Sequence, residues 1–198
     1  VNAFWDGSRM TYGDGNGAPY TPLTSLDIAG HEIAHGLTNF TAGLIYYGES
    51  GALNESFSDI FGTAIENYAR PGDWDWLLSA DIGASFRSLQ NPNAYGDPDT
   101  YMGTFFAPLV GPDNGGVHTN SGVQNFWYYL LNMGGTGVND IGDAYTVNPL
   151  GFERSSAIAF RNLTVYLTPS SDHADARFYA IQSAIDLYGP CSEEEIET

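Results

Sequence analysis

The segment His31-Glu32-Ile33-Ala34-His35 holds the residues best suited to chemistry in this sequence of 198 residues. On an α-helix, positions four apart lie about 40° apart around the axis, so both imidazoles face one point in space. Imidazole nitrogens are zinc ligands, and Glu32 can reach a water on such a metal without ligating it. The alternative is a pair of ordinary histidines on a helix face. The spacing favours a catalytic metal site with Glu32 as general base.

A third ligand is expected nearby, because catalytic zinc usually has three protein ligands and a water. The segment Asn54-Glu55-Ser56-Phe57-Ser58-Asp59 falls on the next predicted helix, where Glu55 can supply that ligand. Asp59 lies four residues later on the same face, and a carboxylate there can accept the N–H of a ligating imidazole. Taken alone, both acids could instead be present because the dipole at a helix N-terminus stabilises a negative charge.

Two helices must position these side chains. The first is predicted from an N-cap at Thr24 or Ser25 to about Asn39, with Asp27 in its first turn. The second is predicted from about Ala52 or Leu53 to Ala69 by its apolar spacing. Further helices are predicted over 117–133, 149–167 and 172–188, a strand and tight turn over 10–17, a mostly irregular stretch over 72–116, and a short helical start over 193–197.

Composition bounds the class of protein. The chain has 24 acidic residues against six arginines and no lysine, a formal charge of −18, so nucleic acid and anionic membranes are unlikely partners. No apolar run approaches the roughly 18 residues that span a bilayer. A chain that is 42% apolar can bury a sizeable core. The single cysteine, Cys191, excludes an internal disulfide, and it is either a free thiol or paired outside the chain.

Several motifs together resemble the thermolysin family of zinc metallopeptidases. They are His31-Glu32-x-x-His35, Gly51-Ala52-Leu53-Asn54-Glu55-x-x-Ser58-Asp59, Asp113-Asn114-Gly115-Gly116-Val117-His118-x-Asn120-Ser121-Gly122, Val1-Asn2-Ala3-Phe4-Trp5 and Tyr166-Leu167-Thr168. The resemblance implies an α+β, mainly α-helical chain with a zincin-type metalloprotease fold. Residues 1–24 would be the end of an N-terminal β-rich lobe carrying a substrate edge segment. Residues 25–198 would form the α-helical zinc-binding lobe, with its last helix truncated.

The resemblance also assigns residues to the site. It implies His31, His35 and Glu55 as zinc ligands, Asp59 as the acceptor that orients His31, and Glu32 as the base. Tyr46 and His118, the latter held by Asp113, would hydrogen-bond the oxyanion. Arg87 would grip substrate carbonyls, Asn2 and Ala3 would bind substrate backbone, and Leu23, Ile28 and Phe86 would form an apolar pocket. Without the resemblance, Tyr46 reads as core, His118 as structural and Arg87 as a solvated surface residue. His173 matches no motif, and we expect it at the surface.

Calcium is the second implied cation. Asp27, Glu66, Asp73 and Asp75 match family positions that ligate it, and Asp75 would do so through its carbonyl. Leu78 stands where a second ion would need an acid, so a single Ca²⁺ is expected. The alternative is an acidic, solvated loop.

These features predict a secreted, monomeric zinc endopeptidase that cleaves peptide or protein substrates before bulky apolar residues. The N-terminus has no signal peptide, which is typical of a mature or truncated product. The alternative is a non-catalytic zinc- and calcium-binding fragment that is inactive because the N-terminal lobe is missing. An aminopeptidase would need an acidic anchor for a free amine, and none is identified in the sequence.

Overall fold

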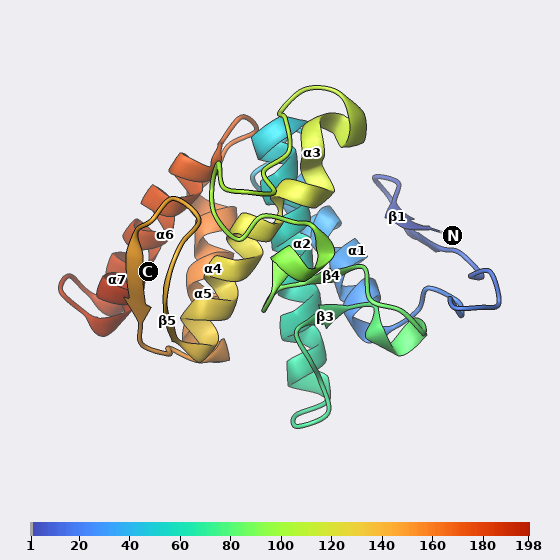
Figure 1. Cartoon of the computed structure of the whole chain (residues 1–198), viewed down its shortest axis with the longest axis horizontal. Coiled ribbons are helices and arrows are strands. Elements are labelled where there is room, and N and C mark those ends of the chain that lie inside the picture. Colours follow the sequence, from blue (N-terminus) through green and yellow to red (C-terminus); the bar gives the residue numbers. More distant parts are fainter. Residues whose placement is uncertain (1) are drawn as a thin grey trace.

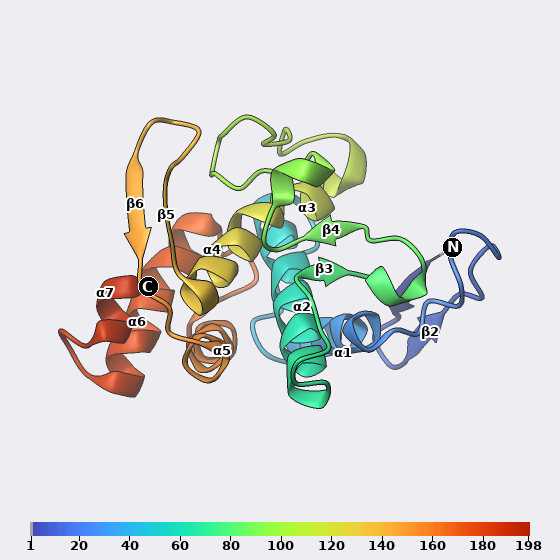
Figure 2. The same cartoon turned by 60° about the horizontal axis from the view of Figure 1, so that its bottom comes forward.

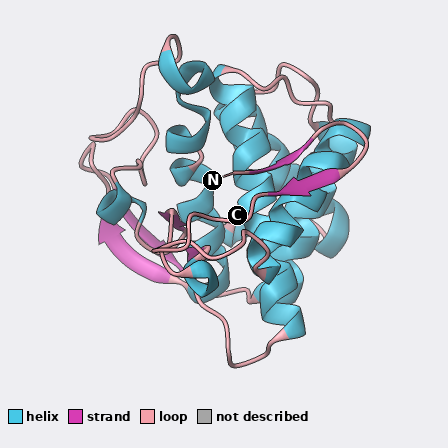
Figure 3. Cartoon of the chain, turned by 90° about the vertical axis from the view of Figure 1, so that its right-hand side faces the viewer, coloured by secondary structure: helices cyan, strands magenta, loops and turns pink. Residues whose placement is uncertain are grey.

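The structure is a computed structural model that describes residues 2–198, so Val1 of the predicted 1–24 segment lies outside the described residues. Helices dominate it, and the strands form small antiparallel pairs (Figure 3). In chain order the elements are β1 (Ala3–Trp5), β2 (Met10–Tyr12), α1 (Leu26–Phe40), α2 (Gly48–Ala69), β3 (Leu77–Leu78), the 3-10 turn η1 (Ala80–Ile82), β4 (Arg87–Ser88), the 3-10 turn η2 (Pro92–Tyr95), α3 (Pro112–Asn120), α4 (Gly122–Met133), β5 (Gly135–Val138), β6 (Ala144–Val147), α5 (Phe152–Arg161), the π-helical turn η3 (Asn162–Tyr166), α6 (His173–Tyr188) and α7 (Glu193–Glu197).

Helix α2 runs through the centre of the molecule (Figure 1). Ten consecutive residues, 51–60, are buried, so this part of the helix is covered on all sides. Leu53, Phe57 and Ile60 are fully buried and anchor the main core cluster, which also takes in Leu163. Because the helix is enclosed, its polar residues must find partners within the protein.

Helices α1 and α2 approach closely at a pair of glycines. A Cβ on Gly62 would lie 2.5 Å from the Asp27 carbonyl oxygen, and one on Gly30 would lie 2.9 Å from the Gly62 Cα. Contacts this short exclude any side chain at either position. The two glycines therefore let the predicted histidine helix lie directly against the predicted glutamate helix.

The strands form three separate two-stranded sheets. β1 pairs with β2, with Phe4 opposite Thr11, and β3 pairs with β4, with Leu78 opposite Arg87. The β5–β6 hairpin, which the sequence did not predict, projects beside α4 (Figure 2). No helix in residues 2–198 is both long and apolar enough to cross a membrane.

Most predicted helices are present, with three corrections. α2 begins at Gly48 rather than at residues 52–53, because the Gly51 N–H already donates to the Tyr47 carbonyl at 3.2 Å and adds a turn ahead of the apolar spacing. The predicted 117–133 helix is divided near Ser121 into α3 and α4. The predicted 149–167 helix begins only at Phe152, and it changes to a π-helical turn after Arg161. The predicted mainly α-helical α+β class is confirmed.

Candidate metal centre

Three predicted zinc ligands come together between α1 and α2. The Nε2 atoms of His31 and His35 lie 3.0 Å apart. The Glu55 carboxylate lies 3.6 Å from the His31 Nε2 and 3.5 Å from the His35 Nε2. Within residues 2–198 these three residues form the only group of three or more histidine, cysteine, aspartate or glutamate side chains with ligand atoms within 4.8 Å of one another.

The donor set fits a zinc ion. Ligand atoms about 2.0–2.1 Å from one tetrahedral centre lie roughly 3.3–3.4 Å apart, close to the three separations above. Two imidazole nitrogens and one carboxylate oxygen are also ligand types that zinc prefers. Glu55 is 1% exposed, so a cation here would be largely shielded from bulk water.

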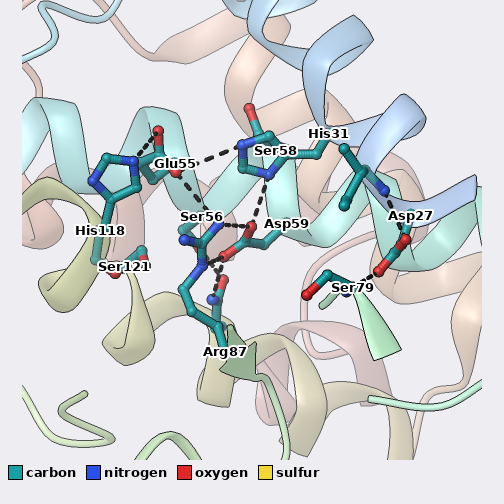
Figure 4. Close-up of polar contacts among 12 residues, drawn as sticks. Asp27, His31, Glu55, Ser56, Ser58, Asp59, Ser79, Arg87, His118 and Ser121 are labelled. Carbon is teal, nitrogen blue, oxygen red and sulfur yellow. Dashed lines mark hydrogen bonds and ion pairs between the residues drawn. The ribbon is translucent and has the colours of Figure 1, made fainter. Parts of the chain in front are cut away.

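Each histidine is oriented through its second ring nitrogen. Asp59 Oδ1 lies 2.8 Å from the His31 Nδ1, as the sequence predicted (Figure 4). The His35 Nδ1 lies 2.8 Å from Asn54 Oδ1 and 3.1 Å from Ser58 Oγ, two contacts that the sequence did not predict. With both Nδ1 atoms engaged, both Nε2 atoms are left facing the common centre.

We expect Asp59→Asn to weaken zinc binding by about 10–100-fold, because the amide cannot hold the His31 ring with a negative charge. The measurement is zinc affinity in a competition titration with a chelating dye. Asp143→Asn, an equal charge change at an exposed position between β5 and β6, is the control and should leave the affinity unchanged. An affinity for the Asp59 variant equal to that of the parent chain would contradict the orienting role.

Arg87 forms a buried ion pair behind the ligands. Its Nε lies 2.8 Å from Asp59 Oδ2 and its Nη2 lies 2.7 Å from Asp59 Oδ1, a two-point contact, and Nη2 is 3.5 Å from the Glu55 carboxylate (Figure 4). Asn125 on α4 adds an amide hydrogen bond of 2.8 Å to Asp59. The reading of Arg87 as a solvated surface residue is therefore wrong, since its side chain is only 15% exposed.

The charges around the ligands set their protonation. Burial opposes ionisation of Asp59, but the Arg87 guanidinium and the hydrogen bond to His31 outweigh it, and the pKa of Asp59 lies well below its usual value. Burial and the His31 ring lower the pKa of His35 to about 4, which keeps this imidazole neutral and able to ligate. For His31, burial is outweighed by the bond to Asp59 and by Glu55, so its pKa is raised. Cation binding there would release a proton.

Glu32 is the buried acid beside the ligands. It is 5% exposed, and no partner is found for its Oε2 atom among the described residues. Burial is the main reason that its pKa is raised. A desolvated carboxylate with one oxygen left without a protein partner is suited to accept a proton from a small molecule bound beside it.

Tyr46 and His118 converge on the same carboxylate from two further segments. The Tyr46 hydroxyl donates to Glu55 and lies 3.2 Å from the His118 Nε2, which is itself 3.4 Å from Glu55. The Asp113 carboxylate accepts from the His118 backbone N–H at 3.0 Å and contacts its Nδ1. The sequence therefore predicted the pairing of Asp113 and His118.

The backbone conformation of the turn before His118 explains why the turn has the sequence Asp113-Asn114-Gly115-Gly116. All four residues have left-handed φ values between 50° and 80°. Aspartate and asparagine tolerate this region best among residues with a Cβ, and glycine has no penalty there. A Cβ on Gly115 would lie 2.4 Å from the Leu109 carbonyl oxygen, so no other residue fits. The turn reverses the chain and brings Asp113 back onto the His118 ring.

The predicted substrate residues all line one cavity. Its volume is about 740 Å³, and its walls include the metal-ligand trio, Glu32, Tyr46 and His118. The predicted substrate contacts that line it are Asn2, Ala3, Leu23, Ile28, Phe86 and Arg87. Trp5 and Leu44 also line it, although the sequence analysis did not assign them to the site. A cavity with apolar walls and a polar centre suits a peptide with an apolar side chain.

The predicted calcium ligands surround a separate, smaller cavity. Asp27, Glu66, Asp73 and Asp75 all line a space of about 110 Å³, together with Asp81. One Asp27 oxygen accepts from the Ile28 N–H at 2.8 Å and the other from the Ser79 N–H. Burial, followed by repulsion from Asp27, Asp81 and Asp75, raises the pKa of Glu66 to about 7. The acids are gathered around one space, but within residues 2–198 no three of their oxygens lie within 4.8 Å of one another.

Asp97 is a half-buried acid in the loop beside Arg87. Burial is the main reason that its pKa rises from 3.8 to about 7, with repulsion from Asp59 and Asp113 adding to it. The folded chain therefore binds this proton more tightly than the unfolded chain. The protonated Asp97 carboxyl therefore stabilises the folded chain fully below about pH 3.8, and this stabilisation is lost as the pH rises through about 7.

We expect Asp97→Asn, which stays neutral, to melt about 2–4 °C above the parent chain at pH 8, and this gain to shrink as the pH falls towards 5. Differential scanning calorimetry from pH 5 to 8 measures the difference. Asp140→Asn, an exposed acid in another loop, controls for the general effect of removing one negative charge. A difference that does not change with pH would contradict the assignment.

One remaining expectation is wrong. His173 is 9% exposed rather than on the surface, because its ring packs near Tyr101 and Phe106 and its Nδ1 lies 3.1 Å from the Glu49 carboxylate. Glu49 lies 124 residues away in the chain, so no local pattern could have indicated the contact. Asn54, by contrast, stood inside a recognised motif, directly before Glu55.

Comparison with known proteins agrees with this geometry. The family model for the α-helical domain of thermolysin metallopeptidases matches residues 42–198, and the model for their catalytic domain matches residues 1–39. The chain is 44% identical to the thermostable neutral protease NprT of Geobacillus stearothermophilus and 47% identical to a bacillolysin of Brevibacillus brevis. Each alignment covers 98% of this chain but only 35% of the relative.

A solved structure gives the same result. The precursor of protealysin, a metalloproteinase of Serratia proteamaculans, superposes with a TM-score of 0.81 at 28% identity. The superposition covers 99% of this chain and 62% of the precursor. The resemblance seen in the sequence motifs is therefore confirmed over 98% of the chain, and the protein belongs to the thermolysin family of metallopeptidases.

Proposed function

We propose that this chain carries the catalytic centre of a zinc endopeptidase. The observation that supports it most is the convergence of His31, His35 and Glu55 beside the buried Glu32, whose Oε2 has no partner among the described residues, in a cavity of about 740 Å³. A purely structural zinc site would need neither the base nor the open cavity. Membership of the thermolysin family of metallopeptidases supports the same function.

The residues have distinct roles in this proposal. Zinc, held by the three ligands, would supply Lewis-acid activation of water and of the scissile carbonyl. Glu32 takes a proton from the attacking water and passes it to the leaving nitrogen. The Tyr46 hydroxyl and the His118 Nε2 stand together at the cavity and donate to the oxyanion as negative charge develops. Asp113 keeps the His118 ring oriented through its contacts with the backbone N–H and Nδ1 of His118.

The substrate lies along β1 and places one apolar side chain in the cavity. Asn2 and Ala3 bind its backbone, while Leu23, Ile28 and Phe86 provide the apolar wall. Leu23 and Ile28 are buried and belong to one core cluster, so this wall is held in place by packing. We therefore propose cleavage on the N-terminal side of bulky apolar residues. The Arg87 side chain uses its Nε and Nη2 on Asp59, which leaves Nη1 to contact a substrate carbonyl.

We also propose that the enzyme is a secreted monomer whose residues 1–24 form the substrate edge and whose residues 25–198 form the zinc-binding lobe. A calcium ion would be held by Asp27, Glu66, Asp73 and the Asp75 carbonyl. The acidic cavity supports this, since oxygen ligands around a charged space suit a hard cation.

Millimolar Ca²⁺ is expected to raise the melting temperature by about 2–4 °C, since it relieves the repulsion among these acids. Thermal denaturation with and without EGTA measures the effect. Glu66→Gln should abolish the gain, while Glu153→Gln, on the exposed start of α5, should keep it. An equal gain in both variants would place calcium elsewhere.

The proposed activity is tested by hydrolysis of casein and of a furylacryloyl-blocked dipeptide with an apolar second residue. The chain with one equivalent of zinc should cleave both substrates, 1,10-phenanthroline should abolish cleavage, and added zinc should restore it. A chain that binds zinc stoichiometrically and cleaves nothing would instead be a non-catalytic zinc- and calcium-binding fragment. Cleavage that is insensitive to the chelator would contradict the metal mechanism.

A further inference from the structure

Asn120, the last residue of α3, holds a neighbouring loop with both ends of its side-chain amide. The Ala107 N–H donates to the Asn120 Oδ1 at 2.8 Å, and the Asn120 Nδ2 donates to the Ala107 carbonyl oxygen at 3.0 Å. The Asn120 side chain is fully buried. Within residues 2–198 these two are the only hydrogen bonds made by residues 107–110. A single buried amide therefore anchors this part of the loop.

The anchored loop supports the glycine turn that precedes His118. A Cβ on Gly115 would lie 2.4 Å from the Leu109 carbonyl oxygen, and a Cβ on Gly116 would lie 2.8 Å from the Ala107 methyl group. The backbone of the turn therefore packs directly on the loop, with no side chain between them. A shift of the loop would be passed on to the turn, because close-packed backbones leave no space to absorb it.

The backbone and the ring of His118 are held by different contacts. Its neighbour Val117 is fully buried and fills the space that a side chain on Gly51 would need, since a Cβ there would lie 2.4 Å from the Val117 Cγ1. This contact fixes the backbone of α3 against the first turns of α2 (Figure 1). The ring can still turn about its side-chain bonds, and its Nδ1 is held only by the Asp113 carboxylate. Because Asp113 belongs to the turn, the orientation of the ring depends on the position of the turn.

We propose that Asn120 is a positioning residue for His118. Its amide holds the loop, the loop supports the glycine turn, and the turn keeps Asp113 against the His118 ring. The ring thereby stays with its Nε2 beside the Tyr46 hydroxyl, 3.2 Å away. The inference rests on the proposed function, in which His118 donates to the oxyanion. Asn120 does not line the zinc cavity, so it acts on the reaction only through His118.

Asn120→Ala is expected to lower kcat on the furylacryloyl dipeptide by about 10–100-fold, with a much smaller change in KM, because the oxyanion forms only after the substrate has bound. In a His118→Ala chain the same substitution should lower kcat no further, since the residue through which it acts is gone. Asn162→Ala is the matched control. Asn162 is also buried, and its Nδ2 donates to the Ala176 carbonyl oxygen at 2.8 Å, so its loss should leave kcat at the parent value.

A second readout does not depend on activity. Because an ionised carboxylate only accepts hydrogen bonds, the His118 Nδ1 carries the proton in its contact with Asp113. This N–H should give a slowly exchanging signal in a heteronuclear NMR spectrum of the imidazole groups of the zinc-loaded chain. The signal is assigned by its absence from His118→Ala. It should be lost from Asn120→Ala and retained in Asn162→Ala.

A milder variant continues the test if Asn120→Ala does not fold. Ala107→Gly keeps both hydrogen bonds to Asn120, because they use the backbone of residue 107, but it removes the methyl group that lies against Gly116. It is therefore expected to weaken the His118 signal and to lower kcat by less than Asn120→Ala.

An equal loss of kcat with and without the His118 side chain would overturn the proposal, because Asn120 would then act on the fold as a whole. So would a His118 Nδ1 signal that is unchanged in the Asn120 variant, or in Ala107→Gly where that variant replaces it. A parent chain that binds zinc and cleaves nothing would instead contradict the proposed function. The NMR signal would then decide the inference by itself, since its loss from Asn120→Ala supports the positioning role and its survival excludes it.

Discussion

Replacing Glu32 by glutamine is expected to lower kcat for peptide hydrolysis by about 10²–10⁴-fold while zinc remains bound. The amide has nearly the same size and can occupy the same buried position, but it cannot take a proton from water. Because Glu32 does not belong to the ligand trio, the metal site should keep its affinity. The measurements are kcat and KM on a furylacryloyl dipeptide and the zinc content of the purified variant.

Two further measurements show whether the loss of kcat comes from the missing general base rather than from a change in the fold. The melting temperature of the variant should not fall, because burial of the Glu32 carboxylate outweighs its attraction to His31 and raises its pKa, so a neutral amide of the same shape removes no net stabilisation. Glu153→Gln, at the exposed start of α5, should retain the parent kcat. A Glu32 variant that contains full zinc and cleaves as fast as the parent chain would show that another group accepts the proton.

Replacing Arg87 by methionine is expected to lower the free energy of unfolding of the zinc-free chain by about 3–5 kcal/mol. Methionine preserves much of the apolar stem but removes the guanidinium. Asp59, which is fully buried, would then lose its two-point contact, and Glu55 would lose its only nearby arginine. Two carboxylates would remain buried with less positive charge beside them. Chemical denaturation followed by circular dichroism, in the presence of a chelator, measures the change.

Saturating zinc should reduce this loss, because the cation restores positive charge next to Glu55 and holds His31 against Asp59. Arg9→Met is the matched control, since Arg9 pairs with Asp6 in solvent, and exposed pairs contribute about 0–1 kcal/mol. The pairing of Arg87 with Asp59 would be contradicted by equal stabilities of the two variants. The double variant Arg87→Met with Asp59→Asn should recover part of the loss, because the unpaired charge is then gone.

The histidine pair is a feature that the sequence could place without knowledge of the surrounding fold. Four-residue spacing on a helix puts two side chains on one face whatever surrounds the helix, because the backbone repeats every 3.6 residues. The same local logic predicted that Asp59 would follow Glu55 on one face, whereas the pairing of Asp113 with His118 was implied only by the resemblance to the thermolysin family. All of these pairs are found together in the structure.

The contacts that hold the site together were decided by packing between distant segments. Arg87 is 28 residues from Asp59, and Asn125 is 66 residues from it, so neither spacing indicates contact. The same is true of His173 and Glu49, and of the β5–β6 hairpin. Sequence alone therefore determined which residues could bind a metal, because helical spacing is a local property. Tertiary structure alone decided which charges are buried together and which stay unpaired, because desolvation depends on every segment that covers them.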